Sequence, residues 1–419
     1  MNAAITKSVV EQLTLEGFER ALENVHQVTR RTPLETSRYL AEVSGAPAVY
    51  LKCENLQRTG AYKLRGAFNR LSQLTAEERA RGVVAASAGN HAQGVAFAAR
   101  ELGIQATIFM PLGVALPKLQ ATRNYGADVV LQGETFGETL AAAQQFVQES
   151  GAMFISPFDH PAIIAGQGTV ALEMLDVAPE IETFVVPIGG GGLISGVAAA
   201  AKLRAARDGR HIRVVGVQSE NTSAFIPSLE AGEPVTIQAK PTIADGIAVA
   251  RPGDLTFQFV QKYVDEIVTV SDDEIASAIV MLLERTKLVV EPAGAAGVAA
   301  ILAAKFTPSG PTATILSGGN IDPLLLQRVI GHGLAASARY LKLRILLPDI
   351  PGQLVKTASI VASNNANVVE VLHTRHSTDL PISQVELELH IETRGAEHGK
   401  VIVQALRDAG YEVRVGEKY

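Results

Sequence analysis

The sequence predicts an α/β body followed by a smaller α+β domain, and two patterns in the chain indicate this. From about residue 80, short runs rich in Val and Ile alternate with amphipathic stretches, as in parallel sheets covered by helices on both faces. After about residue 335, the segment 383–391 alternates strictly between apolar and polar residues, as a half-exposed antiparallel strand does. Of the 419 residues, 47% are hydrophobic, which excludes a disordered chain and allows large buried cores.

The expected strands of the α/β body are short apolar runs at residues 83–86, 106–110, 128–131, 152–156, 183–188, 214–218 and 312–316. The helices expected between them cover residues 92–102, 117–125, 136–149, 162–175, 193–206 and 272–285. Pro117 suits the first turn of a helix and Gly126 its end. Ser271 and Glu274 have the spacing of a capping box, which predicts where the last of these helices begins.

The C-terminal segment predicts its own small fold. We expect strands at residues 341–347, 367–372, 383–391 and 411–415, with helices near 354–361 and 401–407. The resulting order βαββαβ is that of a ferredoxin-like domain. We therefore place a domain boundary between residues 335 and 336.

Composition excludes several classes of protein. The chain has 37 basic and 43 acidic residues, a net charge of −6, so it lacks the basic character of a nucleic-acid-binding protein. We also expect no membrane association, because no apolar run reaches the length of a membrane span. Cys53 is the single cysteine, and residues 1–11 do not resemble a secretory signal. These features predict a cytoplasmic protein.

Two motifs near the N-terminal half could carry chemistry. Lys63 lies in the segment 59–67. A lysine that follows a glycine and precedes helix-forming residues is ordinarily an exposed surface residue at the start of a helix. The segment 87–94 follows a strand and opens a helix, where free N–H groups favour an anion such as a carboxylate, although Asn90 could simply cap that helix. His91 is expected to be a packing residue, and we expect no metal site, because no second His stands at metal-ligand spacing.

Two further motifs are rich in glycine. The run Gly189, Gly190, Gly191, Gly192 also joins a strand to a helix, and its N–H groups form a cradle for a phosphate. It fits neither the dinucleotide fingerprint nor the Walker loop, so the phosphate belongs to something other than NAD or ATP. The segment 317–320 follows the last strand of the body and could be a plain glycine turn, as 291–295 could be a helix-capping segment.

Taken together, a lysine amine, a phosphate cradle and a carboxylate-binding turn are the parts of a site for pyridoxal 5′-phosphate. The segments 61–66, 87–91, 189–192 and 317–320 resemble the threonine dehydratase (threonine ammonia-lyase) family, and the resemblance covers residues 5–330. It implies the tryptophan-synthase-β-like fold, which is fold type II of pyridoxal phosphate enzymes. Such a catalytic body has two parallel-sheet subdomains, here residues 1–335 with a small subdomain inserted at about 55–157.

The resemblance also implies roles for individual residues. Lys63 matches the catalytic lysine that carries the cofactor. The other cofactor-binding positions are Asn90 at the ring oxygen, Ser317 at the ring nitrogen, and the phosphate loop Gly189, Gly190, Gly191, Gly192 and Leu193. The substrate-carboxylate loop corresponds to Ser87, Ala88, Gly89, Asn90 and His91. Many relatives have Ser at the position of Ala61, a difference that the cofactor bond tolerates. Related serine racemases have Ser where this chain has Ala88, so elimination is expected in preference to racemisation.

The expected reaction is the β-elimination of water from L-threonine, which yields 2-oxobutanoate and ammonia, as in the first step of isoleucine biosynthesis. L-Serine would give pyruvate by the same route. Alternatives within the fold are serine dehydratase, serine racemase and threonine synthase. A non-catalytic amino-acid sensor and a nicotinamide-dependent dehydrogenase are alternatives from other classes, and the failed dinucleotide fingerprint disfavours the dehydrogenase.

The C-terminal segment resembles an ACT-type regulatory domain in its motifs 348–354 and 364–370. The resemblance implies that an amino-acid effector such as isoleucine or valine binds at Gly352 and Leu354, facing Asn367 and Val368 of a neighbouring copy. It also implies a homo-oligomer, a dimer or a tetramer. A purely structural dimerisation module is the alternative.

Overall fold

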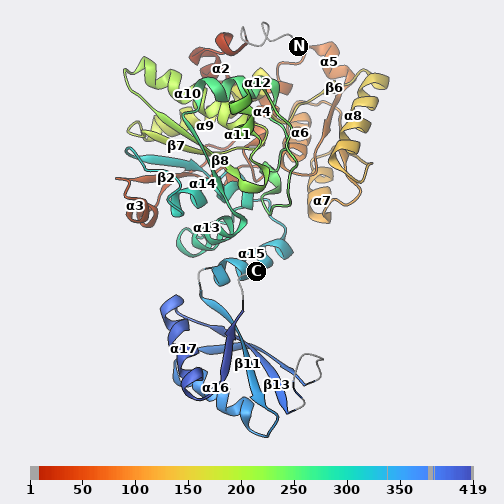
Figure 1. Ribbon diagram of the computed structural model, residues 1–419. Coiled ribbons are helices and arrows are strands. Elements are labelled where there is room, and N and C mark those ends of the chain that lie inside the picture. Colours follow the sequence, from red (N-terminus) through yellow and green to blue (C-terminus); the bar gives the residue numbers. More distant parts are fainter. Residues whose placement is uncertain (1–8, 337, 376–380, 382, 417–419) are drawn as a thin grey trace. The chain divides into compact units, whose positions relative to one another are not determined.

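The computed structural model describes residues 9–336, 338–375, 381 and 383–416. The chain divides into two compact units, residues 1–322 and 323–419 (Figure 1). Each unit has its own hydrophobic core. The boundary expected after residue 335 lies at the end of α15 (Pro323–Ala336), a helix that groups with the second unit.

The larger sheet of the first unit has the strand order β1-β2-β10-β7-β8-β9. Its strands are β1 (Leu34–Thr36), β2 (Val49–Lys52), β7 (Thr183–Pro187), β8 (Arg213–Ser219), β9 (Glu266–Val270) and β10 (Thr312–Ile315). Five of them run parallel, as expected, whereas the edge strand β1 pairs antiparallel with β2.

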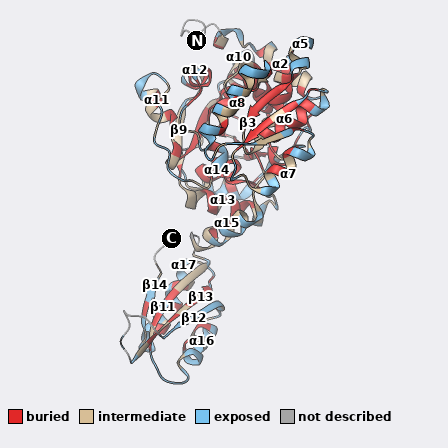
Figure 2. Cartoon of the chain, turned by 90° about the vertical axis from the view of Figure 1, so that its right-hand side faces the viewer, coloured by how far each residue is buried: buried red, intermediate tan, exposed pale blue. Residues whose placement is uncertain are grey.

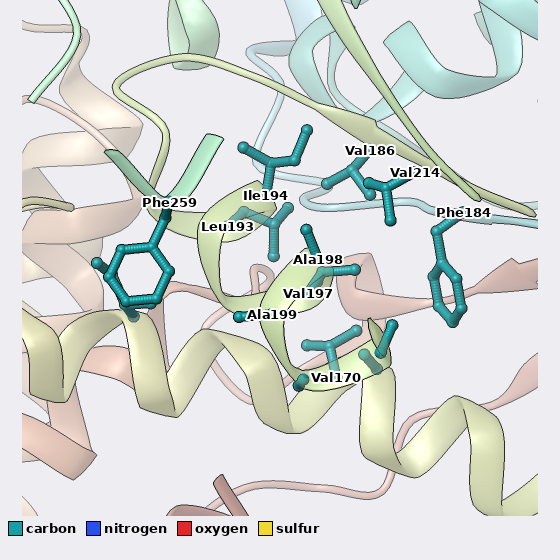
Figure 3. Close-up of a cluster of buried hydrophobic side chains, with 14 of the residues drawn as sticks. Val170, Phe184, Val186, Leu193, Ile194, Val197, Ala198, Ala199, Val214 and Phe259 are labelled. Atoms are coloured by element: carbon teal, nitrogen blue, oxygen red, sulfur yellow. The ribbon is translucent and has the colours of Figure 1, made fainter. Parts of the chain in front are cut away.

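Helices cover both faces of this sheet. On one face, α10 (Gly192–Arg207) packs between the sheet and α9 (Pro161–Val177), and Phe184 and Val186 of β7 point toward it (Figure 3). On the other face lies α14 (Pro292–Leu302), where Gly297 approaches Thr314 so closely that a Cβ would overlap its hydroxyl. The other helices of this part are α2 (Leu15–Val25), α3 (Arg38–Ser44), η1 (Glu54–Leu56), η2 (Glu220–Thr222), α11 (Phe225–Ala231), η3 (Asp245–Ile247), α12 (Asp254–Tyr263) and α13 (Asp272–Arg285).

A second, fully parallel sheet is built from residues between β2 and β7 in the chain, in the order β5-β4-β3-β6. Its strands are β3 (Val83–Ala86), β4 (Ala106–Met110), β5 (Asp128–Leu131) and β6 (Met153–Phe154). The helices are α4 (Lys63–Leu71), α5 (Ala76–Arg81), α6 (Asn90–Glu101), α7 (Leu116–Asn124) and α8 (Phe136–Ser150). Buried hydrophobic residues lie on both faces of this sheet, and its strand β3 is coloured as buried in Figure 2. Two sheets of mainly parallel strands in one unit confirm the predicted α/β class with two parallel-sheet subdomains.

The second unit is an antiparallel sheet of order β12-β13-β11-β14. Its elements are β11 (Tyr340–Pro348), α16 (Gln353–Ser363), β12 (Asn367–Thr374), β13 (Gln384–Glu392), α17 (Ala396–Asp408) and β14 (Glu412–Val415). The order βαββαβ is confirmed, and the alternating residues Val385, Leu387, Leu389 and Ile391 are all buried. The last helix begins five residues earlier than expected, at Ala396 after Gly395.

A buried network of charged side chains joins β2, η1, α4 and α9. Arg65 donates to both Glu54 and Glu173, with N···O distances of 2.8 Å, and Lys52 Nζ lies 2.7 Å from Glu173 Oε2. The exposed fraction of these four side chains is 2% or less. Two positive and two negative charges therefore compensate one another inside the protein. One of them, Arg65, lies on α4, the helix that begins with Lys63.

Cys53 lies at the start of η1, next to this network, and is fully buried. Burial raises the pKa of its thiol to about 12.

None of the helices in the described part of the chain is long and apolar enough to cross a membrane.

Candidate active site

A cavity of about 770 Å³ lies in the first unit, where parallel strands of its two sheets end. Residues that follow β3, β7 and β10 line it, consistent with the rule that ligands of parallel sheets bind at the carboxyl ends of the strands. The structure brings together the four sequence motifs here: the lining residues include Lys63, Ser87, Ala88, Gly89, Asn90, His91, Gly189, Gly190, Gly191, Gly192, Leu193 and Ser317.

Lys63 begins α4, and its side chain lies in the cavity rather than on the outer surface. The amine donates a hydrogen bond to the carbonyl oxygen of Pro157 at 2.9 Å. Burial lowers the pKa of this amine to about 8, although the carboxylate of Glu291 opposes the shift. Lys63 is half-buried, and the lowered pKa gives a larger neutral fraction of its amine near neutral pH than an ordinary lysine has, which suits a nucleophile or a general base.

The glycine loop connects β7 to α10 and is held from both sides. Gly191 caps α10 with φ of 97°, a conformation that favours glycine. A Cβ at Gly190 would overlap the ring of Phe158, so the backbone here packs directly on that ring. On the other side, Thr256 Oγ1 donates to the carbonyl oxygen of Gly190 at 2.6 Å. The loop is therefore a rigid cradle at the N-terminus of a 16-residue helix, with N–H groups suited to a phosphate.

The segment after β3 opens α6 at Asn90, two residues earlier than expected, and Gly89 is the cap instead of Asn90. The Asn90 side chain is thereby free to reach into the cavity. His91 Nε2 donates to the carbonyl oxygen of Ile155 at 2.9 Å, and the ring is buried. Burial and the nearby Lys63 lower the pKa of His91 to about 3, so the ring is neutral. These contacts match the packing role expected for this histidine.

Asn90 belongs to a chain of hydrogen bonds that joins the motifs at 59–67, 87–94 and 317–320. Asn320 Nδ2 donates to the carbonyl oxygen of Thr59 and to Asn90 Oδ1, both at 2.8 Å. Asn90 Nδ2 in turn donates to Glu291 Oε1 at 2.7 Å. Ser317 is buried in the cavity wall, and its carbonyl oxygen accepts the N–H of Tyr62.

Sequence reasoning missed Glu291, which it assigned to a helix-capping segment. The residue does stand at the N-cap of α14, but its carboxylate makes no capping bond to that helix and bonds Asn90 instead. The one signal in the sequence was a single charged residue in front of a long stretch of small apolar residues.

The rim of the cavity also carries residues that the motifs did not indicate. Lys118 Nζ on α7 lies 2.7 Å from Asp245 Oδ2 on η3, so an ion pair joins the two sheet regions at the edge of the cavity. Phe136 and Leu140 of α8 add an apolar part to the lining. The cavity thus combines charged groups with an apolar wall.

The positions expected to bind an effector all lie in the second unit. Gly352 caps α16 with φ of 88°, and Leu354 follows in the first turn of that helix. Asn367 and Val368 begin β12, the strand against which α16 packs. Their regulatory role stays a prediction.

The residues of the cavity fit pyridoxal phosphate. The cofactor needs an amine for its aldehyde, N–H donors for its phosphate and polar partners for its ring, and Lys63, the glycine loop and Asn90 lie around one cavity. A Cβ at Gly190 or Gly192 would overlap Phe158, so both positions require glycine and the loop backbone there carries no side chains.

Comparison with known proteins agrees with this arrangement. Residues 25–318 match the family described as pyridoxal-phosphate dependent enzyme, and the chain belongs to that family. It is 48% identical to the L-threonine ammonia-lyase of Thermotoga maritima over 96% of this chain and 99% of that protein. The L-threonine ammonia-lyase of Geobacter sulfurreducens is 47% identical over 95% and 98% of the two chains.

Solved structures of related enzymes are also similar to this chain. Threonine deaminase isoform 2 from Solanum lycopersicum has a TM-score of 0.71 at 36% identity, covering 75% of this chain and 92% of that one. Maize serine racemase also has a TM-score of 0.71 at 36% identity, covering 77% and 98%. The protein is therefore a pyridoxal phosphate enzyme, as the sequence motifs indicated.

Proposed function

We propose that this protein is an L-threonine ammonia-lyase, which converts L-threonine to 2-oxobutanoate and ammonia. The observation that carries the proposal is the position of the Lys63 amine and the glycine loop around one cavity. The near full-length similarity to the two bacterial L-threonine ammonia-lyases supports the substrate. L-Serine is a second candidate substrate, and it would yield pyruvate.

In this proposal, pyridoxal phosphate supplies an electron-withdrawing group for the Cα of the amino acid. When the cofactor is bound, the N–H groups of residues 189–193 would hold its phosphate, Asn90 would be the partner of its ring oxygen, and Ser317 would be the partner of its ring nitrogen. The N–H groups at the start of α6, in the segment 87–91, bind the substrate carboxylate.

Lys63 acts as the general base that takes the proton from the substrate Cα. Its lowered pKa allows the amine to be neutral and to accept that proton near neutral pH. Ser317 is a neutral partner for the ring nitrogen, which favours prompt loss of the β-hydroxyl over transamination. Ala88 has no group that could deliver a proton to the opposite face of Cα, which disfavours racemisation.

Replacing Lys63 tests the proposal. Lys63→Ala should remove the visible absorption band of the lysine-bound cofactor and nearly all release of 2-oxobutanoate from L-threonine. A purified Lys63→Ala protein that kept both properties would contradict the assignment. Assays of 2-oxo acid release from L-threonine and L-serine, side by side, determine the preferred substrate.

The proposal extends to the second unit. We infer that it is an ACT-like regulatory domain that binds an amino-acid effector such as isoleucine or valine, and that the enzyme is a homo-oligomer. The ferredoxin-like order of its elements and the resemblance of its motifs support this. A cytoplasmic location stays a prediction from the sequence.

A further inference from the structure

The carboxylate of Glu291 is placed in an unusual way for a helix-capping residue. A polar side chain at an N-cap can accept N–H groups of the first helical turn, which is worth about 1 kcal/mol. Glu291 gives up that bond, and its carboxylate turns toward Asn90 in the cavity, although it is 94% buried. A buried carboxylate costs free energy unless its interactions compensate, so this placement requires an explanation beyond helix capping.

The surroundings of Glu291 are shaped to hold this orientation. Gly318 leaves the space that the carboxylate occupies, because a Cβ there would overlap Glu291 Oε1. The backbone N–H of Glu291 donates to the carbonyl oxygen of Gly318 at 3.0 Å, which fixes the residue beside the fourth motif. Backbone and side chain of Glu291 are thus both tied to the wall of the cavity.

The hydrogen bonds determine which way the Asn90 amide points. The carbonyl oxygen of Thr59 can only accept, so the group of Asn320 that faces it must be its NH₂. That NH₂ also donates to Asn90, so the atom of Asn90 on this side is the oxygen. The NH₂ of Asn90 then faces Glu291, and its second hydrogen is available to a ligand in the cavity.

We propose that Glu291 is a positioning residue, which holds the Asn90 amide with its NH₂ group toward the cavity and thereby orients it to donate to the ring oxygen of the bound cofactor. This inference rests on the proposed role of Asn90 as the partner of that oxygen. It assigns a function to a carboxylate that none of the four motifs required.

The charge of Glu291 makes this orientation sensitive to pH. Burial and, to a smaller extent, the charge of Asp245 raise the pKa of Glu291 to about 7, although the bond from Asn90 and the charges of Lys118 and Lys63 oppose the shift. Below pH 7 the carboxyl group is mostly protonated and accepts less strongly from Asn90. Above pH 7 it is an anion that accepts strongly, so the affinity for the cofactor should rise as the pH increases through 7.

Four variants of the full-length enzyme test the proposal: Glu291→Gln, Glu291→Ala, Asn90→Ala and the double variant Asn90→Ala/Glu291→Ala. We would measure the dissociation constant of pyridoxal phosphate and its absorption maximum after titration into each cofactor-free protein. Glu291→Ala should weaken cofactor binding by about tenfold or more and shift the absorption maximum. The double variant should be no worse than Asn90→Ala, because Glu291 acts through Asn90.

Glu291→Gln separates the hydrogen bond from the charge. Its amide oxygen can still accept from Asn90, so at pH 8 its cofactor affinity should stay within about threefold of the wild type. Because an amide does not titrate, the increase in affinity between pH 6 and 8 should become smaller than in the wild type, and the part that remains comes from the Lys63 amine, whose pKa is about 8. Glu291→Gln also covers the case in which Glu291→Ala does not fold.

Three results would overturn the proposal: an unchanged dissociation constant and spectrum in Glu291→Ala, additive losses in the double variant, or a wild-type pH dependence in Glu291→Gln. The cofactor titrations do not depend on the substrate. If the wild-type enzyme fails to release 2-oxobutanoate from L-threonine, the proposed reaction is wrong, and the titrations still decide the role of Glu291.

Discussion

Single glycines in the phosphate loop fix how close a ligand can approach the backbone. Gly190 packs on the ring of Phe158 on one side, and its carbonyl oxygen accepts from Thr256 on the other. Any side chain at this position must displace one of these neighbours, which also hold the N–H groups of the loop. The loop therefore depends on the absence of side chains as much as on the backbone conformations that glycine allows.

Gly190→Ala should weaken the binding of pyridoxal phosphate by about tenfold or more, because overpacking a rigid site costs about 1–3 kcal/mol. The measurement is a cofactor titration followed by absorbance. Gly113→Ala is a matched control, since a Cβ there meets nothing within 4 Å. Adding Phe158→Leu to Gly190→Ala should recover part of the affinity. Wild-type affinity in Gly190→Ala would show that the loop can shift without cost.

At this scale, the sequence predicts residues whose chemistry requires a rare local pattern. Four consecutive glycines and a lysine after a glycine are visible in one dimension, and the structure places them around one cavity. Glu291 could not be found in the same way. Its importance depends on the direction of its side chain, which the bonds to Asn90 and the space beside Gly318 determine.

Among the secondary-structure elements, α4 carries the reactive lysine, and a buried ion network holds this helix. Arg65, two residues after Lys63, bridges Glu54 of η1 and Glu173 of α9. Burial alone would raise the pKa of Glu173, but Arg65 and Lys52 lower it from its usual 4.5 to about 2. The network thus ties α4 to two neighbouring elements through charged groups that water does not screen.

Glu173→Ala should destabilise the enzyme by about 3–5 kcal/mol, because it leaves buried positive charges without a partner. Denaturant unfolding of the cofactor-loaded enzyme measures the change. Glu397→Ala, at an exposed pair with Lys400, is the control and should have little effect.

The same variant tests the pH dependence of stability. Because the folded state lowers the pKa of Glu173, its stabilising contribution is complete above pH 4.5 and is lost as the pH falls toward 2. The wild type should lose more stability than Glu173→Ala over this range. Equal losses in the two proteins would show that Glu173 does not govern the acid sensitivity.

Elements with a strong apolar or periodic signal were the ones that the sequence predicted well. The helix α13 has the expected bounds and its capping box of Ser271 and Glu274. By contrast, β6 has two residues instead of five, because only Met153 and Phe154 pair with β3. The strands β1 and β2 were missed, since they are short and carry charged residues next to their apolar ones.

At the scale of the whole molecule, all the proposed catalytic residues belong to the first unit, which ends at Asp322. The second unit has its own sheet and its own core. The pattern change near residue 335 indicated this division from the sequence. The assignment of α15 could not be predicted, because it depends on contacts of this helix with β11.

Two truncations test the separation of chemistry from regulation. Chains that end at residue 335 or at Asp322 should still release 2-oxobutanoate from L-threonine, but isoleucine or valine should no longer change the rate. The full-length chain is the control for the effector response. A truncated enzyme with an unchanged response would rule out an effector site in the second unit. Comparing the two truncations shows whether α15 is needed by the first unit.

The burial of Cys53 has a practical consequence for spectroscopy. Its thiol is inaccessible and its pKa is about 12, so maleimide dyes and nitroxide reagents should leave the native protein unlabelled near neutral pH. A pair of cysteines introduced at exposed sites such as Val43 and Val401 would then be the only reactive positions. Energy transfer between dyes at those sites could follow the separation of the two units in solution while amino acids are added, without first removing a natural cysteine.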